Sequence, residues 1–395
     1  MKRKKVSELA KQIRGVSYNP EDLHENLDEN SVTLLRANNI FEGRINFDDV
    51  VYVDKSKVTM EQYLCKGDIL VCASSGSKQL VGKAASFNFE TECTFGAFCK
   101  VVRPNQDVAN YLSVYFQSNA YRRKISEVAI GANINNIRNE HIDALELPIG
   151  SNAENEKVVA SFSLLQQIID GRKQQLHKLD DLVKARFVEL FGNPISNPMK
   201  WDTYQLEECL ERIDNGKSFI CSDKPRVGDT PAILKLSAAT YGDYRPNENK
   251  ALLDESLFVE SAEVHAGDLL FTRKNTPELV GTAAYVQNTP SKLMMPDLIF
   301  RLVPNEKVNA VFLWQLINCK EFRPVIQAIS GGSAKSMSNI SKERLGKIKV
   351  ICPPRELQDS LIPFVEQTDK SKAAIQKALD EAQLLFDSLM QKYFG

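Results

Sequence analysis

Residues 154–190 read ENEKVVASFSLLQQIIDGRKQQLHKLDDLVKARFVEL, a stretch with no proline and a single glycine, Gly171. Apolar residues recur along it at alternating spacings of four and three, from Val158 to Leu190. That spacing is typical of a helix that packs along its length against another helix. Gly192 and Pro194 follow, as residues that end helices commonly do. We therefore predict one long helix over residues 151–192.

A second segment of the same kind covers residues 353–395, where the four-three spacing returns. Pro363 lies inside it, and an interior proline removes a backbone hydrogen bond and clashes with the preceding turn. We expect either a kink at Pro363 or a helix that properly starts there. At 1.5 Å per residue, each of the two helices would be roughly 55 Å long.

Each predicted helix carries a long apolar stripe that needs a partner. The simplest way to bury both stripes is to pair the helices as an antiparallel coiled coil about a pseudo-two-fold axis. The alternative is that each helix packs on its own globular domain, but a helix of about 55 Å overhangs a domain of about 150 residues. The residues predicted to pair the helices are Phe162, Leu165, Ile169, Leu176, Leu179, Val183, Ile375, Ala382, Leu385 and Leu389.

The rest of the chain contains the same unit twice. The matches keep one order: GDIL at 67–70 with GDLL at 267–270, LVGKAA at 80–85 with LVGTAA at 279–284, and FG at 191–192 with FG at 394–395. A shared order with nearly constant offsets indicates an internal duplication. We predict an α+β protein with two tandem mixed α/β domains, residues 1–150 and 193–352, each followed by a long helix.

Composition excludes several classes of protein. The 395 residues include 50 Lys+Arg and 51 Asp+Glu, and 43% are hydrophobic, which is typical of a folded protein. A net charge of −1 argues against a basic, sequence-blind coat on nucleic acid, although positive charge could be confined to one face. No run of about 18 apolar residues exists, and none follows the basic start KRKK at 2–5, so we expect neither a membrane span nor a secretory signal.

The sequence also lacks recognisable catalytic chemistry. Its eight cysteines form no C-x-x-C pair and its four histidines have no ligand spacing, so we expect no metal site, and reduced thiols in a cytoplasmic protein. Phosphate-binding glycine loops, nucleophile elbows and H-E-x-x-H helices are missing. We interpret the chain as a binder or scaffold rather than an enzyme, with no catalytic residue and no cofactor of its own.

Two pairs of loops recur at matched positions with different contents: residues 72–79 with 272–277, and residues 131–136 with 331–336. Hydroxyl groups, lysine and backbone N–H groups suit phosphate oxygens, arginine suits guanine edges and asparagine suits adenine edges. The alternative is that these loops are ordinary turns chosen for their backbone conformation. The basic clusters at 121–124 and 344–349 could likewise contact phosphates or be solvated faces. The candidate DNA-binding residues are Ser74, Ser75, Ser77, Lys78, Asn133, Asn135, Arg273, Lys274, Asn275, Ser333, Lys335 and Ser336.

Two similar domains, each followed by a long helix, resemble the specificity subunit of type I restriction–modification systems. The residues that carry the likeness are GDIL and GDLL at the starts of matched strands, PPRELQ at 353–358, FVELFGNP at 187–194 and MQKYFG at 390–395. The first copy departs from this pattern: it has Pro148-Ile149 and Asn155 where the second has Pro353-Pro354 and Gln358.

The resemblance implies that residues 1–150 and 193–352 are target recognition domains, each reading one half of a bipartite DNA sequence. The helices at 151–192 and 353–395 would be spacers and docking surfaces for two modification subunits, which bring S-adenosylmethionine and methylate adenine in double-stranded DNA. A restriction subunit, a translocase and nuclease, would bring ATP and Mg²⁺. The alternatives are a coiled-coil adaptor that binds proteins through duplicated domains, an enzyme with cryptic nuclease chemistry, and a system whose methylase and nuclease are fused.

Overall fold

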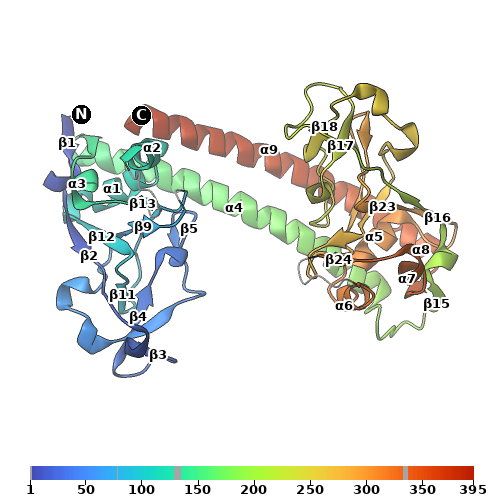
Figure 1. Ribbon diagram of the computed structural model, residues 1–395, viewed down its shortest axis with the longest axis horizontal. Coiled ribbons are helices and arrows are strands. Elements are labelled where there is room, and N and C mark those ends of the chain that lie inside the picture. The colour runs from blue at the N-terminus through green and yellow to red at the C-terminus, as the bar shows by residue number, and fades with distance from the viewer. Residues whose placement is uncertain (1, 78, 129–134, 332–336) are drawn as a thin grey trace. The chain divides into compact units, whose positions relative to one another are not determined.

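The computed structural model describes residues 2–77, 79–128, 135–331 and 337–395 (Figure 1). The chain forms two compact units: unit 1 contains residues 1–173 and 376–395, and unit 2 contains residues 174–375. Each unit holds one mixed α/β domain together with part of each long helix. The predicted architecture of two tandem α/β domains, each followed by a long helix, is confirmed.

The domain of unit 1 is built on two small sheets. The first is antiparallel throughout, and Leu70 and Val101 form a fully buried pair at its centre. In the second sheet, one outer strand runs parallel to its neighbour. In spatial order the first sheet contains β10 (Ala84–Ser86), β8 (Ile69–Cys72), β12 (Cys99–Pro104) and β2 (Ala10–Arg14), and the second contains β11 (Cys93–Phe95), β4 (Ser31–Leu35), β7 (Val51–Asp54) and β3 (Leu23–His24).

The domain of unit 2 repeats this topology, which confirms the internal duplication. Its first sheet has the same strand order and the same antiparallel pairing, and its second sheet again has a parallel outer strand. The first sheet contains β21 (Ala283–Tyr285), β19 (Leu269–Thr272), β23 (Ile299–Pro304) and β16 (Leu210–Asn215), and the second contains β22 (Leu293–Met294), β17 (Ala232–Leu234) and β18 (Asn249–Ala251).

Further elements also correspond between the two domains. Two-stranded pairs join the beginning of each domain to its end: β1 (Lys2–Lys5) with β14 (Glu146–Ile149), and β15 (Asp202–Gln205) with β25 (Lys349–Cys352). The first domain has helices α1 (Ala109–Phe116), α2 (Asn119–Val128) and α3 (Asn139–Asp143), and the second has α5 (Ala310–Asn318), α6 (Arg323–Ala328) and α7 (Lys342–Gly346).

The repeated Gly-Asp motif before β8 and β19 is explained by an ion pair with the central strand of the sheet. Asp68 is 1% exposed and accepts hydrogen bonds from Nε and Nη2 of Arg103 at 2.8 and 2.7 Å. In unit 2, Asp268 pairs with Nε of Arg301 at 3.0 Å. Each carboxylate also accepts the backbone N–H three residues before it. The motif therefore closes a turn and anchors it to the sheet.

The long helices are α4 (Asn152–Phe191) and α9 (Leu361–Phe394), and the short helix α8 (Arg355–Asp359) precedes α9. Of the two outcomes expected at Pro363, the structure shows a helix start, because the break between α8 and α9 lies at Ser360. Pro363 thus lies in the first turn of α9, where backbone N–H groups have no partner inside the helix. Among the described residues, no helix combines the length and apolar character needed to cross a membrane.

The two helices pair in antiparallel fashion within each unit. In unit 1, Phe162 near the start of α4 packs against Phe386 near the end of α9, with ring centroids 5.2 Å apart and the planes at 78°. In unit 2, Lys372 of α9 pairs with Asp180 of α4 at 2.5 Å, and the Arg186 guanidinium lies 5.9 Å from the Phe364 ring. The pairing predicted from the apolar stripes is confirmed.

One residue was wrongly predicted to lie in the seam between the two helices. Leu385 is 50% exposed, and Phe386 contacts α4 in its place. A strict four-three repeat averages 3.5 residues per turn, whereas a straight helix has 3.6, so the contacting positions drift along the helix. Of the others, Phe162, Leu165, Ile169 and Val183 are buried, and Leu176, Leu179, Ile375, Ala382 and Leu389 are half-buried.

Each domain also packs on the long helices. The helices therefore contact both each other and the globular domains. In unit 1, the Phe394 ring of α9 lies 5.4 Å from Tyr111 and 5.6 Å from Tyr115 of α1. In unit 2, Phe312 of α5 lies 4.9 Å from Phe191 of α4. Aromatic contacts of this kind bury large areas and add specific edge-to-face geometry. The domain of each unit is therefore anchored to a helix end.

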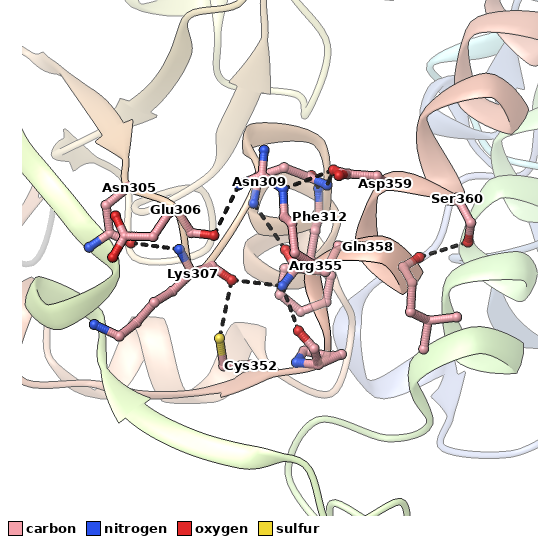
Figure 2. A network of polar contacts seen from close by, with 12 residues as sticks. Asn305, Glu306, Lys307, Asn309, Phe312, Cys352, Arg355, Gln358, Asp359 and Ser360 are labelled. Carbon is pink, nitrogen blue, oxygen red and sulfur yellow. Dashed lines mark hydrogen bonds and ion pairs between the residues drawn. The ribbon is translucent and has the colours of Figure 1, made fainter.

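A buried glutamine organises the start of α8 (Figure 2). The side chain of Gln358 accepts from the Asn309 N–H at 2.9 Å and donates to the carbonyls of Lys307 and Pro353, both at 2.8 Å. In the first copy, Asn155 is also buried; it accepts from the Gly150 N–H at 3.0 Å and donates to the Gly150 carbonyl at 3.4 Å. The two copies thus differ in the amide residue but share a buried amide that satisfies backbone groups at a helix start.

We expect Gln358→Ala to lower the free energy of unfolding by about 2 kcal/mol, because it leaves the buried Asn309 N–H and the buried Pro353 carbonyl without their side-chain partner, whereas the Lys307 carbonyl still accepts from the Cys352 thiol. Urea unfolding monitored by circular dichroism measures the change. Ser360→Ala is the matched control. Ser360 lies two positions after Gln358, and its exposed hydroxyl donates to the Leu357 carbonyl. Equal effects of the two substitutions would contradict this role of Gln358.

Candidate nucleic-acid interface

Two short strands, each in or beside a loop that the sequence singled out separately, pair with each other in unit 1. Strand β9 (Ser74–Ser75) pairs antiparallel with β13 (Asn135–Asn136), and Asn135 lies opposite Ser75. Ser74 and Ser75 are half-buried, whereas Ser77 is exposed and its N–H donates to the Ser75 hydroxyl at 3.2 Å. The first domain therefore gathers hydroxyl and amide residues at one place.

Unit 2 pairs the two corresponding short strands in the same way. Strand β20 (Lys274–Asn275) pairs antiparallel with β24 (Ser338–Asn339), and Lys274 lies opposite Asn339. The backbone arrangement is thus shared between the copies, while the side chains on it differ. A common framework with different contents is what two readers of different DNA sequences require.

The Asn275 side chain is used within its own domain. It is buried, its Nδ2 donates to the Thr240 hydroxyl at 3.1 Å, and its Oδ1 accepts from the Thr276 N–H at 2.9 Å. Because both ends of the amide already have partners, its observed role is to hold the turn after β20. A contact between Asn275 and an adenine edge stays a prediction.

Arg273 and Lys274 differ in their availability. The Arg273 guanidinium lies 4.9 Å from the centre of the Phe300 ring, and its Nη2 donates to Asn339 at 3.3 Å. Among the described residues, Lys274 forms a loose ion pair, with its Nζ 4.0 Å from Asp297. Of these two cations, Lys274 is the better placed to meet a phosphate.

Several predicted DNA-binding residues lie outside the described parts of the chain: Lys78, Asn133, Ser333, Lys335 and Ser336. Their DNA contacts stay predictions.

The structure adds residues that the sequence reasoning missed. Asn136, Ser338 and Asn339 lie on the partner strands β13 and β24. A hollow of about 480 Å³ opens beside β24, and its lining includes Asn339 and Arg344. The repeated Asn-Ile pair at 136–137 and 339–340 is the sequence signal that could have identified the two asparagines.

The buried thiols of Cys72 and Cys99 in unit 1 are not reactive. Cys72 and Cys99 face each other on β8 and β12, and burial raises the pKa of both thiols. They therefore stay protonated at neutral pH and make poor nucleophiles. Within the described ranges, no three His, Cys, Asp or Glu side chains are grouped so that they could hold a metal ion.

Comparison with known proteins places this arrangement in a family. Residues 198–383 match the family model described as type I restriction modification DNA specificity domain. The specificity subunit of type I restriction enzyme EcoKI from Escherichia coli strain K12 is 28% identical over 415 residues, which cover 98% of this chain and 87% of that protein. The StySPI specificity subunit from Salmonella potsdam is 28% identical over 403 residues, covering 98% and 86%.

Over 98% of its length the chain is similar to specificity subunits of type I restriction enzymes. The resemblance seen in the sequence is thereby confirmed. The crystal structure of a type I specificity subunit from M. genitalium shares the fold, with a TM-score of 0.59 at 14% identity, and the match covers 100% of this chain and 96% of that one. The family model matches residues in the second half of this chain, and the shared strand order extends the likeness to its first domain.

Proposed function

We propose that this chain reads the DNA sequence for a type I restriction–modification complex, with one half of a bipartite target assigned to each domain. The observation that carries the proposal is the matched pairing of β9 with β13 and of β20 with β24. Each pair has its own residues on a common backbone: serine and asparagine in the first pair, and lysine, serine and asparagine in the second. Two such surfaces allow two different half-sites to be read by one protein.

Within these surfaces we assign different roles to different side chains. The exposed Ser77 hydroxyl and the loosely paired Lys274 ammonium are suited to phosphate oxygens, which fix the position of a protein on DNA. The residues that distinguish bases would come from the same strand pairs and from the loops next to these strands. Binding through phosphates makes the affinity for DNA fall as the salt concentration rises.

Catalysis would rest with partner subunits. In unit 1, the long helices expose large apolar side chains away from their seam, including Leu164 of α4 at 59% and Leu384 of α9 at 68%. Exposed apolar groups on a helix surface are typical of protein docking sites. We propose that such surfaces hold two modification subunits that methylate adenine with S-adenosylmethionine, and that a restriction subunit supplies ATP- and Mg²⁺-dependent translocation and cleavage. The chain itself would hold no cofactor.

A domain exchange tests the proposal. Residues 1–150 are replaced by the corresponding domain of another specificity subunit, and methylated adenines are mapped by sequencing after co-expression with the modification subunit. The junction at Gly150 lies between β14 and α4 and keeps the β1–β14 pair within one domain. The incoming domain should retain aromatic residues at positions 111 and 115, which pack on Phe394.

The expected result is a complete change in one half of the methylated motif, with the other half unaltered. The reciprocal exchange of residues 193–352 is the matched control and should change the other half only. A motif that keeps both halves after either exchange would overturn the assignment. A chain that assembles with its partners but directs no methylation would instead favour a protein-binding adaptor.

A further inference from the structure

An arginine from α2 holds the loop that follows β9 in unit 1. We call residues 79–82 the first reading loop. Nη1 of Arg122 donates to the Val81 carbonyl at 2.8 Å, and Nη2 donates to the Gln79 carbonyl at 2.9 Å. A guanidinium is planar and presents its donors in a rigid fork, so it can hold two carbonyls in one orientation. Arg122 thereby ties the backbone of the first reading loop to α2.

The second unit contains the same brace. We call residues 276–281 the second reading loop. Arg323, at the start of α6, donates from Nη1 to the Gly281 carbonyl at 2.5 Å and from Nη2 to the Val280 carbonyl at 2.6 Å. Gln327, one turn later on α6, donates to the Glu278 carbonyl at 3.1 Å. The brace is therefore retained although the side chains of the two loops differ.

The loops are also pressed closely onto the helices that carry the arginines. Gly82 and Gly281 have φ angles of +77° and +75°, which favour glycine. A Cβ atom on Gly82 would lie 2.4 Å from Cγ2 of Ile125 in α2, and one on Gly281 would lie 2.2 Å from Cγ2 of Ile326 in α6. Close approach at the glycine and hydrogen bonds from the arginine together leave each loop little freedom.

The contacts of the two arginines indicate what their charge is used for. Their hydrogen bonds run to backbone carbonyls of the loops, and in the described parts of the chain neither guanidinium pairs with a carboxylate. Burial lowers the pKa of Arg323, so placing this cation here carries a desolvation cost. The guanidinium of Arg323 thus hydrogen-bonds the backbone of the second reading loop instead of forming an ion pair with a described carboxylate.

We propose that Arg122 and Arg323 are positioning residues for DNA reading, each fixing one reading loop so that its side chains meet the DNA in a single conformation. The inference rests on the proposed function, since it assumes that these loops contact the target. Each arginine braces only the loop of its own domain. Loss of one brace should therefore impair one half of the target and spare the other.

The experiment uses the full chain assembled with its modification subunits. The initial methylation rate is measured on the cognate site and on DNA panels with single base changes in either half. Arg122→Ala should lower the cognate rate about tenfold and relax base preference in one half only, since a loosened loop contacts correct and incorrect bases more equally. Arg323→Ala should do the same in the other half. Arg122→Lys retains a donor and should recover part of the rate and the preference.

Arg123→Ala is the matched control for base preference, because it removes the same charge from the next, exposed position of α2 and should leave the preference in both halves unchanged. A thermal unfolding curve of each complex separates loss of assembly from loss of reading. If Arg122→Ala does not assemble, Arg122→Lys decides alone, and wild-type base preference would overturn the proposal. Slower methylation on every panel with no change in preference would also overturn it. A wild-type complex without sequence preference would refute the proposed function instead.

Discussion

Replacing Phe394 with alanine is expected to lower the free energy of unfolding of unit 1 by about 3–5 kcal/mol, which is typical of a buried phenylalanine. The residue lies in the last turn of α9, yet its ring is only 4% exposed. Three aromatic rings surround it, with centroids at 5.4 Å for Tyr111, 5.6 Å for Tyr115 and 6.2 Å for Phe162. The substitution leaves a cavity where the domain, α4 and α9 meet. Urea unfolding of the full chain measures the loss.

Leu385→Ala is the matched control for this prediction. Leu385 lies on the same helix and in the same unit, but it is exposed, so its truncation should change the free energy of unfolding very little. An equal loss for the two variants, or a negligible loss for Phe394→Ala, would contradict the role assigned to the aromatic cluster.

Replacing Asp68 with alanine is expected to cost about 3–5 kcal/mol, because it strands a partly buried guanidinium without its counter-charge. Arg103 is held by two charge-assisted hydrogen bonds to this carboxylate, and its Nη2 also donates to the Tyr63 carbonyl at 2.7 Å. The pair anchors the turn before β8, and β8 leads directly to β9 and the first reading loop. Thermal unfolding of the full chain measures the loss of stability.

Two comparisons sharpen the Asp68 prediction. Lys66→Ala breaks an exposed ion pair with Glu90 at 3.2 Å, only two positions away, and should have little effect. The double variant Asp68→Ala with Arg103→Met removes the stranded charge and should be more stable than Asp68→Ala alone. If adding Arg103→Met makes the protein less stable still, the stranded charge is not the cause.

The structure agrees best with the sequence where the information is local. The helix predicted over 151–192 is α4, Asn152–Phe191. It could be predicted because apolar residues recur with the helical period along the whole segment. The duplication was visible because matched residues, such as the two Gly-Asp pairs, serve similar contacts in both copies: each aspartate pairs with an arginine of the neighbouring strand. Leu385 was misassigned because the period decides which stripe is apolar but not which partner each side chain meets as the helix turns.

The sequence by itself determined the two domains, the two long helices and the resemblance to type I specificity subunits, since these depend on periodicity, repetition and short motifs. Only the tertiary structure decided how the candidate site is assembled. It paired Ser75 with Asn135, 60 residues further along the chain, and it enclosed Asn275 beside Thr240. It also showed that Arg122, which belongs to a cluster of candidate phosphate ligands, hydrogen-bonds the backbone of the first reading loop. The physical reason is that a polar side chain can face solvent or satisfy buried backbone groups, and the partners that decide between the two come from distant segments of the chain.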